Sequence, residues 1–142
     1  MNTRENMDAA LKAVVVPSLR KHGFTGSLPH FRRIKEEVDL LTFQFDRHGG
    51  GFVIEAAKGK KEGFTTHWGQ HIPASKLTAW DLHPNDRKRL KPPAVSDTDY
   101  WFRYDRSEDC ESVARFALHL ILGEVEPIQR ATDNDGAVPR RV

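Results

Sequence analysis

Residues 38–57 read VDLLTFQFDRHGGGFVIEAA. In the first half of this stretch, Leu41, Phe43 and Phe45 alternate with polar residues and so share one side of an extended chain. Because successive side chains in a strand point to opposite faces, this alternation predicts a strand with one buried face. Three glycines at 49–51 give the backbone freedom that a chain reversal needs, and a second apolar run follows them. The stretch therefore predicts a β-hairpin at the centre of a small sheet.

Helices are predicted on both sides of this hairpin. Apolar residues at helical spacing predict a first helix over residues 8–22, although Pro17 is expected to kink or break it. Ser107 suits the N-cap of a second helix that continues to about Glu124. The buried face of this second helix is expected to hold Val113, Phe116, Ala117, Leu120 and Ile121. Turns are expected at 25–29 and 58–63, and further strands at 31–34, 64–68 and 100–104.

The order of these elements predicts the fold and its extent. We expect an α+β fold, in which an antiparallel β-sheet of about four to six strands in a meander is packed by an N-terminal and a C-terminal helix. A chain of 142 residues fits a single domain. Residues 1–130 are expected to form it, and the short polar stretch 131–142 is expected to be a disordered C-terminal tail.

Composition narrows the classes of partner. Lys and Arg number 22 and Asp and Glu 20, and this near balance argues against nucleic acid as a partner. No apolar run approaches the roughly twenty residues of a membrane span, so no membrane partner is expected. No Gly-rich phosphate loop or dinucleotide motif occurs, and we expect no cofactor. The single Cys110 and the polar N-terminus favour a cytoplasmic location.

The segment that follows the predicted hairpin lacks clear periodicity. Four prolines interrupt residues 69–93, and a loop of this length is either functional or contains short helical turns, for instance at 84–90. The candidate binding residues are the aromatic and basic side chains in and beside this segment: Trp68, Trp80, Arg87, Arg89 and Trp101. Two basic clusters, Lys58, Lys60 and Lys61 and then Arg87, Lys88, Arg89 and Lys91, could form a surface for single-stranded nucleic acid together with Trp68, Trp80, Tyr100 and Trp101. Solvated basic turns and buried aromatic rings explain these residues better.

Three histidines form the alternative candidate site. His67 and His71 are four residues apart, with His83 beyond them, and together they could ligate one metal ion. The metalloprotease motif requires Glu directly after the first histidine, where this chain has Trp68, and no cysteine accompanies the set. Surface or hydrogen-bonded histidines are therefore the simpler interpretation.

Cys110 is a second residue that could carry chemistry. It falls in the first turn of the predicted second helix, where the helix dipole would favour the thiolate. A free cysteine is more often a small buried residue, and nothing else in the sequence is typical of a thiol enzyme.

Two segments resemble a family of uncharacterised bacterial proteins, the domain-of-unknown-function family 4304. The first is LKAVVVPSLRKHGF at 11–24, followed by Phe-Arg at 31–32, similar to the family's opening helix and aromatic-basic strand. The second is Arg-Leu at 89–90, followed by Asp-Tyr-Trp-Phe at 99–102. The resemblance implies a bacterial α+β domain without an assigned reaction, and it offers no catalytic residues. The chain departs from the family pattern in the lysine-rich stretch at 58–63.

These observations favour a non-enzymatic binding or interaction domain. Its contact surface is expected to be the sheet face and the loop at 67–99, because loops on rigid scaffolds often carry binding. The expected partner is a protein, while its identity and the oligomeric state stay open. A metal-dependent hydrolase using His67, His71 and His83, and weak nucleic-acid binding through the basic turns, are the alternatives.

Overall fold

The computed structural model describes residues 3–105 and 109–126. The main sheet consists of β1 (Thr25–Ser27), β2 (His30–Ile34), β3 (Glu37–Phe45), β4 (Gly51–Lys60), β7 (Arg87–Arg89) and β8 (Phe102–Arg103). The helices are α1 (Arg4–Lys21) and α2 (Cys110–Val125). The chain between β4 and β7 forms a small hairpin, β5 (Phe64–Thr65) and β6 (His71–Ile72), and three 3-10 turns, η1 (Ala74–Lys76), η2 (Ala79–Asp81) and η3 (Pro84–Asp86).

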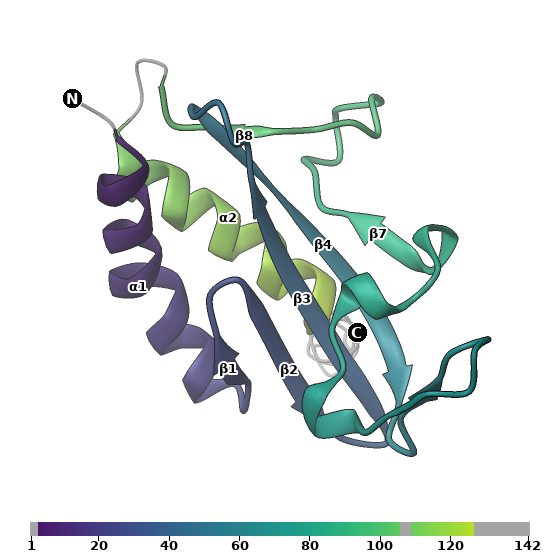
Figure 1. Ribbon diagram of the computed structural model, residues 1–142. Coiled ribbons are helices and arrows are strands. Elements are labelled where there is room, and N and C mark those ends of the chain that lie inside the picture. Colours follow the sequence, from purple (N-terminus) through teal and green to yellow (C-terminus); the bar gives the residue numbers. More distant parts are fainter. Residues whose placement is uncertain (1–2, 106–108, 127–142) are drawn as a thin grey trace, which may run out of the picture.

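The strands form an antiparallel sheet in the order β1-β2-β3-β4-β7, and β8 pairs with the other end of β4 (Figure 1). Both helices pack on one face of this sheet and contribute to a shared core. The predicted α+β fold, a meander packed by an N-terminal and a C-terminal helix, is therefore confirmed. The predicted tail at 131–142 lies outside the described residues. The predicted N-cap Ser107 is wrong, because α2 begins at Cys110 and its N-cap is Asp109, whose side chain accepts from the Ser112 N–H at 2.7 Å.

The central hairpin is present as predicted but is longer than predicted. Phe43 pairs with Ile54 and Phe45 with Phe52, and the reversal falls at 46–50, where the glycines lie. The strand β4 continues to Lys60, so the turn predicted at 58–63 is wrong in its first half. The turn predicted at 25–29 is likewise partly strand, because residues of β1 pair with β2.

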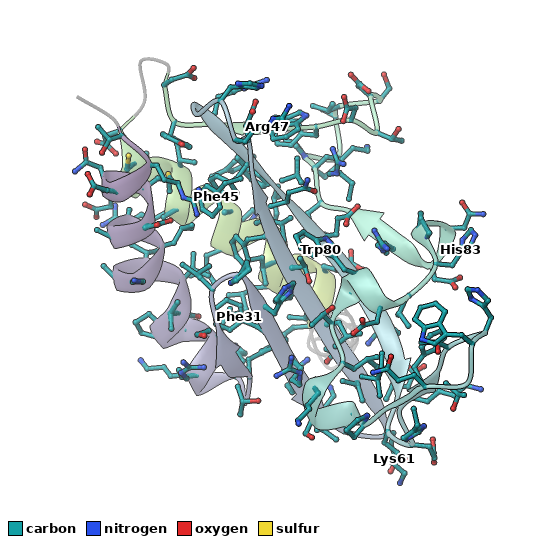
Figure 2. The ribbon with its side chains drawn as sticks, viewed as in Figure 1. Phe31, Phe45, Arg47, Lys61, Trp80 and His83 are labelled. Carbon is teal, nitrogen blue, oxygen red and sulfur yellow. The ribbon has the colours of Figure 1, made fainter. Side chains whose placement is uncertain are left out.

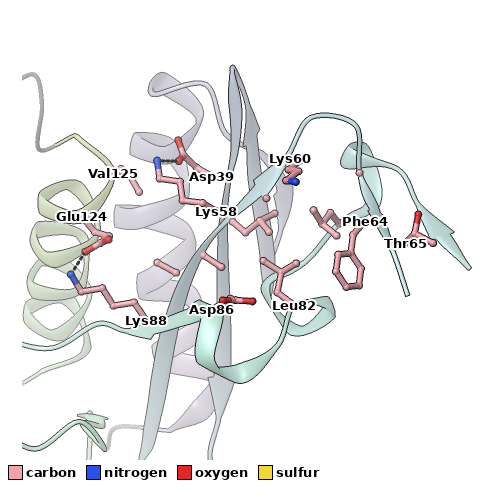
Figure 3. Close-up of a pocket in the computed structure, with 16 residues that line it drawn as sticks. Asp39, Lys58, Lys60, Phe64, Thr65, Leu82, Asp86, Lys88, Glu124 and Val125 are labelled. Atoms are coloured by element: carbon pink, nitrogen blue, oxygen red, sulfur yellow. Dashed lines mark hydrogen bonds and ion pairs between the residues drawn. The ribbon is translucent and has the colours of Figure 1, made fainter. Parts of the chain in front are cut away.

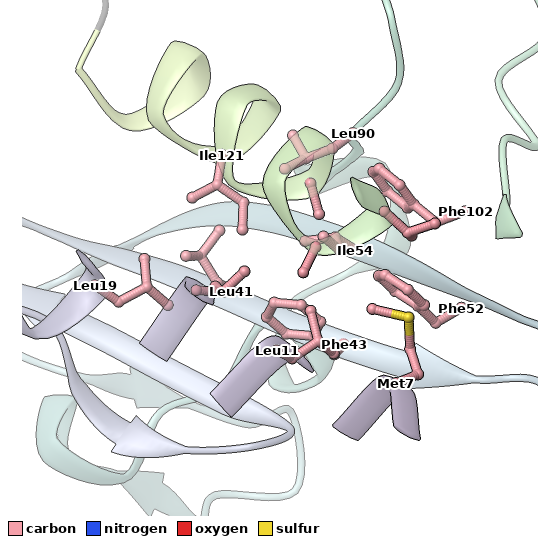
Figure 4. Packing of buried hydrophobic residues seen from close by; sticks show 14 of the residues in the cluster. Met7, Leu11, Leu19, Leu41, Phe43, Phe52, Ile54, Leu90, Phe102 and Ile121 are labelled. Carbon is pink, nitrogen blue, oxygen red and sulfur yellow. The ribbon is translucent and has the colours of Figure 1, made fainter. Parts of the chain in front are cut away.

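The main core lies between the helices and the sheet (Figure 4). The helix α1 contributes residues at helical spacing to this core. The strands contribute a row of aromatic rings, in which Phe52 and Phe102 stack with their ring centroids 5.0 Å apart. The buried α2 residues of this core are Cys110, Val113, Ala114, Ala117 and Ile121. The predicted burial of Phe116 is wrong, since 39% of this residue is exposed, because the buried face of α2 is centred on Ala117.

A second core covers the opposite face of the hairpin. It consists of Val38, Leu40, Ala57, Ala74, Leu77, Ala79 and Leu82. The prediction of one buried face is therefore wrong for this half of the hairpin, because the 3-10 turns of residues 74–82 pack against it. The long segment contains short helical turns, as one of its two interpretations required.

The helix α1 is continuous through Pro17, so the predicted break is wrong. A proline within a helix removes one hydrogen bond to the carbonyl four residues earlier. Here that carbonyl belongs to Ala13, and both residues are exposed, so water can replace the missing partner. The helix begins earlier than predicted because Thr3 and Asn6 form a capping box at its N-terminus.

Candidate functional site

A cavity of about 620 Å³ lies beside the end of β4, where the sheet is incomplete (Figure 3). The strand β7 pairs with residues 55–57 of β4, and among the described residues no strand pairs with this edge at 58–60. Figure 3 shows Lys58 and Lys88 on the α2 side of β4 and Phe64 and Leu82 on the other side. The cavity therefore wraps around an open strand edge, and we call it the edge pocket.

The backbone of β4 presents polar groups to the edge pocket. In an antiparallel ladder, the N–H and C=O groups of successive residues point to opposite sides of the strand. The Ile54 carbonyl accepts from the Leu90 N–H on the β7 side, so Lys58 and Lys60 direct their backbone groups to the same side. The Lys60 carbonyl already accepts from the Gly63 N–H at 2.9 Å, so the Lys58 groups and the Lys60 N–H are the ones that face the edge pocket.

The floor of the edge pocket is apolar and closely packed. Leu40, Ala57, Leu77 and Leu82 line it and belong to the second core. A Cβ atom at Gly59 would lie 2.6 Å from Leu77 Cδ2, closer than such atoms approach, so glycine permits the covering segment to pack on β4. The combination of an apolar floor with polar backbone groups is typical of a binding site.

Ion pairs fix the wall on the α2 side. The Asp39 side chain is only 3% exposed, and it accepts from Arg33 Nε at 2.9 Å and from Lys58 Nζ at 2.6 Å. Burial alone would raise the pKa of Asp39, but the hydrogen bonds from Lys58 and Arg33 outweigh it and lower the pKa. Asp39 is therefore a charged anchor of the wall and is poorly suited to donate a proton.

The Asp39 carboxylate makes the free energy of unfolding depend on pH in the acid range. Because its pKa is lower in the folded chain, its contribution is present above the ordinary carboxyl pKa of about 4 and is lost as pH falls through the folded pKa. We expect Asp39→Asn to lower the unfolding free energy by roughly 2 kcal/mol at pH 7, and the difference to shrink below about pH 4. Urea denaturation at both pH values measures this, and a difference independent of pH would contradict it.

Two of the predicted binding residues, Trp80 and Arg87, lie together. Arg87 Nη2 donates to the carbonyls of Trp80 at 3.0 Å and Leu82 at 2.8 Å, so it holds the turn that carries Trp80. The Trp80 ring meets His30 edge-on, with centroids 5.1 Å apart, over the sheet (Figure 2). Arg87 thus supports the segment beside the edge pocket.

The other three predicted binding residues are spread over the molecule. Trp68 is 67% exposed at the tip of the β5–β6 hairpin. Arg89 pairs with Asp99 at 2.8 Å, and Trp101 lies under the Arg103 guanidinium. The five residues therefore do not form one site.

Lys58 and Lys60 entered the sequence analysis only in the nucleic-acid alternative, as part of a basic turn at 58–63. Their place on a strand edge was not predicted, because the stretch was expected to be a turn. Lys58 and Lys60 alternate with Gly59, and this continues the period of the preceding strand. That alternation was the feature of the sequence from which a longer strand could have been predicted.

The three candidate metal ligands each have a local contact. His71 Nδ1 lies 3.1 Å from Thr65 Oγ1, and the His67 ring meets Trp68 edge-on. His83 Nδ1 accepts from the Asn85 N–H, and Figure 2 shows its side chain at the periphery. Within residues 3–105 and 109–126, no group of three or more His, Cys, Asp or Glu side chains is arranged to hold a metal ion.

Cys110 lies at the start of α2 but is buried. Burial raises the pKa of its thiol, and the neighbouring Asp109 carboxylate adds to the rise. The buried-residue interpretation is therefore confirmed, and burial of Cys110 opposes formation of the thiolate.

Comparisons with known proteins identify the family of the chain. No helix in the described part of the chain has the length and apolar character needed to cross a membrane. No curated protein and no solved structure matches the chain. A family model described as "Domain of unknown function (DUF4304)" matches residues 15–131, which include both strands of the hairpin and every residue of the edge pocket. The chain therefore belongs to the DUF4304 family, as its helix and aromatic segments predicted.

Proposed function

We propose that this domain is a non-enzymatic, protein-binding module and that the edge pocket is its contact surface. The observation that carries the proposal is the open edge of β4 at 58–60, beside an apolar floor. Exposed strand edges bind extended chains through backbone hydrogen bonds, and adjacent pockets take the side chains. The pocket joins the sheet to the segment after β4, where binding was expected. We further propose that the domain acts in the bacterial cytoplasm, because of its single cysteine and its family resemblance.

The charges of the edge pocket support binding in preference to catalysis. A carboxyl group that acts as a general acid needs a pKa raised toward the working pH. Asp39 has a lowered pKa and is held by Arg33 and Lys58, while Glu124 pairs with Lys88 at 2.9 Å. Ion pairs of this kind position the walls of a site.

Nucleic-acid binding receives less support from the basic residues. Lys58 pairs with Asp39, Arg89 pairs with Asp99, and Arg87 is bonded to backbone carbonyls. Phosphate contacts need cations that are free to face the backbone of the nucleic acid.

Site-specific photo-crosslinking tests the proposed function. A benzoylphenylalanine placed at Lys60, at the open edge, is expected to form a covalent adduct with a discrete protein from an extract of the source organism. The same group at Lys12, which is exposed on α1, is the matched control. Excess unlabelled protein should abolish the adduct. No adduct at Lys60, or the same adducts from both positions, would contradict the proposal.

A further inference from the structure

A second cavity, of about 490 Å³, adjoins the edge pocket. It lies between α2 and the chain that follows β7, and we call it the helix pocket. Lys88 and Glu124 line both cavities, and their side chains form an ion pair at 2.9 Å (Figure 3). The Lys88 side chain is 69% exposed, and an exposed pair of this kind contributes little to stability. The ion pair that the two cavities share is therefore weak.

The helix pocket combines a positive rim with an exposed aromatic ring. Lys88, Arg89 and Lys91 line it with Glu124 as the one carboxylate, and Phe116 of α2 is 39% exposed there. Arg89 Nε is buried and has no hydrogen-bond partner among the described residues, so one donor of its guanidinium is unused. The chemistry of this cavity fits carboxylates next to an apolar side chain.

We propose that the two cavities form one groove for an acidic, extended segment of the protein partner. Five Lys and Arg side chains and three Asp and Glu side chains line the groove, which leaves an excess of two positive charges. The segment pairs with the open edge at 58–60, and its apolar side chains pack on the apolar floor and on Phe116. Lys88 releases Glu124 and pairs with a carboxylate of the partner. This exchange joins the two cavities. This inference deepens the proposed function and rests on it.

Peptide binding to the full chain tests the groove. The probe is a fluorescein-labelled peptide in which glutamate alternates with leucine or phenylalanine, and the comparison peptide has lysine in place of glutamate. Alternation presents the apolar side chains on one face of an extended peptide. Fluorescence polarisation is expected to show saturable binding of the glutamate peptide and none of the lysine peptide.

Charge variants locate the binding. Lys60→Glu combined with Lys88→Glu is expected to weaken binding of the glutamate peptide at least about tenfold, because it reverses two exposed charges of the groove. Glu124→Gln is expected to strengthen binding several-fold, because it removes the carboxylate that competes for Lys88. Lys12→Glu, a single charge reversal on α1 away from the groove, should leave affinity unchanged, and circular dichroism confirms that each variant is folded.

The outcomes separate this inference from the proposed function. Equal binding of both peptides, weaker binding by Glu124→Gln, or an equal effect of Lys12→Glu would overturn the acidic groove. If a crosslinked partner is nevertheless obtained at Lys60, the proposed protein-binding function stands without the acidic groove. Absence of both the crosslinked adduct and peptide binding would overturn both.

Discussion

Replacement of Arg33 by alanine is expected to lower the free energy of unfolding by about 3–5 kcal/mol, the range for loss of one partner of a buried ion pair. The Arg33 side chain is 8% exposed and donates to the carboxylates of Asp39 and Glu126. It also donates to the carbonyls of His22 at 3.0 Å and Val125 at 3.0 Å. One guanidinium therefore joins the sheet to the C-terminal ends of both helices.

Two further effects increase the loss of unfolding free energy in the Arg33→Ala variant. The carbonyls at a helix C-terminus lack partners within the helix, and a cation there also interacts favourably with the helix dipole. Arg33 supplies both functions for α1 and α2, and its guanidinium lies 4.7 Å from the centre of the Phe24 ring. Alanine would remove this donor from the partly buried carbonyls of His22 and Val125.

Urea denaturation followed by circular dichroism measures the effect. Arg115→Ala is the matched control, because Arg115 pairs with Glu111 on the exposed side of α2 and its side chain is 70% exposed. Pairs of this type are worth about 0.3–0.5 kcal/mol. Similar losses in the two variants would show that Arg33 does not connect the helices to the sheet.

The sequence predicted the parts of the fold that repeat regularly along the chain. The alternation of Leu41, Phe43 and Phe45 was sufficient for the hairpin, and helical spacing was sufficient for both helices. The role of Arg33 had no such signal, because its partner Glu126 lies 93 positions away. Contacts between distant residues depend on the tertiary arrangement, which local periodicity does not encode.

The second core and the edge pocket were missed for a related reason. The residues that cover the outer face, such as Leu77 and Leu82, lie in 3-10 turns and irregular chain, which have no long apolar period. Without that cover, the hairpin had one predicted buried face, and Leu40 had no predicted neighbour. Once 58–63 was interpreted as a turn, an open strand edge at 58–60 could not be foreseen either.

Replacement of Phe52 by alanine is expected to cost about 3–5 kcal/mol of unfolding free energy. Phe52 is fully buried at the centre of the aromatic row, stacked on Phe102 at 5.0 Å and next to Phe45 at 5.3 Å. Its ring neighbours come from β3 and β8. The strands on both sides therefore prevent collapse of the cavity that the alanine substitution would leave. Urea denaturation at neutral pH measures the change.

Phe116→Ala is the matched control for Phe52→Ala, because the same side chain is removed from a position that is 39% exposed. Its ring contacts Phe102 edge-on at 6.1 Å, and aromatic pairs of this kind are worth about 0.5–1.5 kcal/mol. The stability loss should therefore be much smaller than for Phe52, whereas the affinity for the glutamate peptide should fall, since Phe116 lines the helix pocket. Equal stability losses would place Phe116 in the core and remove it from the proposed groove. A large loss of stability at Phe52 together with a selective loss of binding at Phe116 would separate the core from the contact surface.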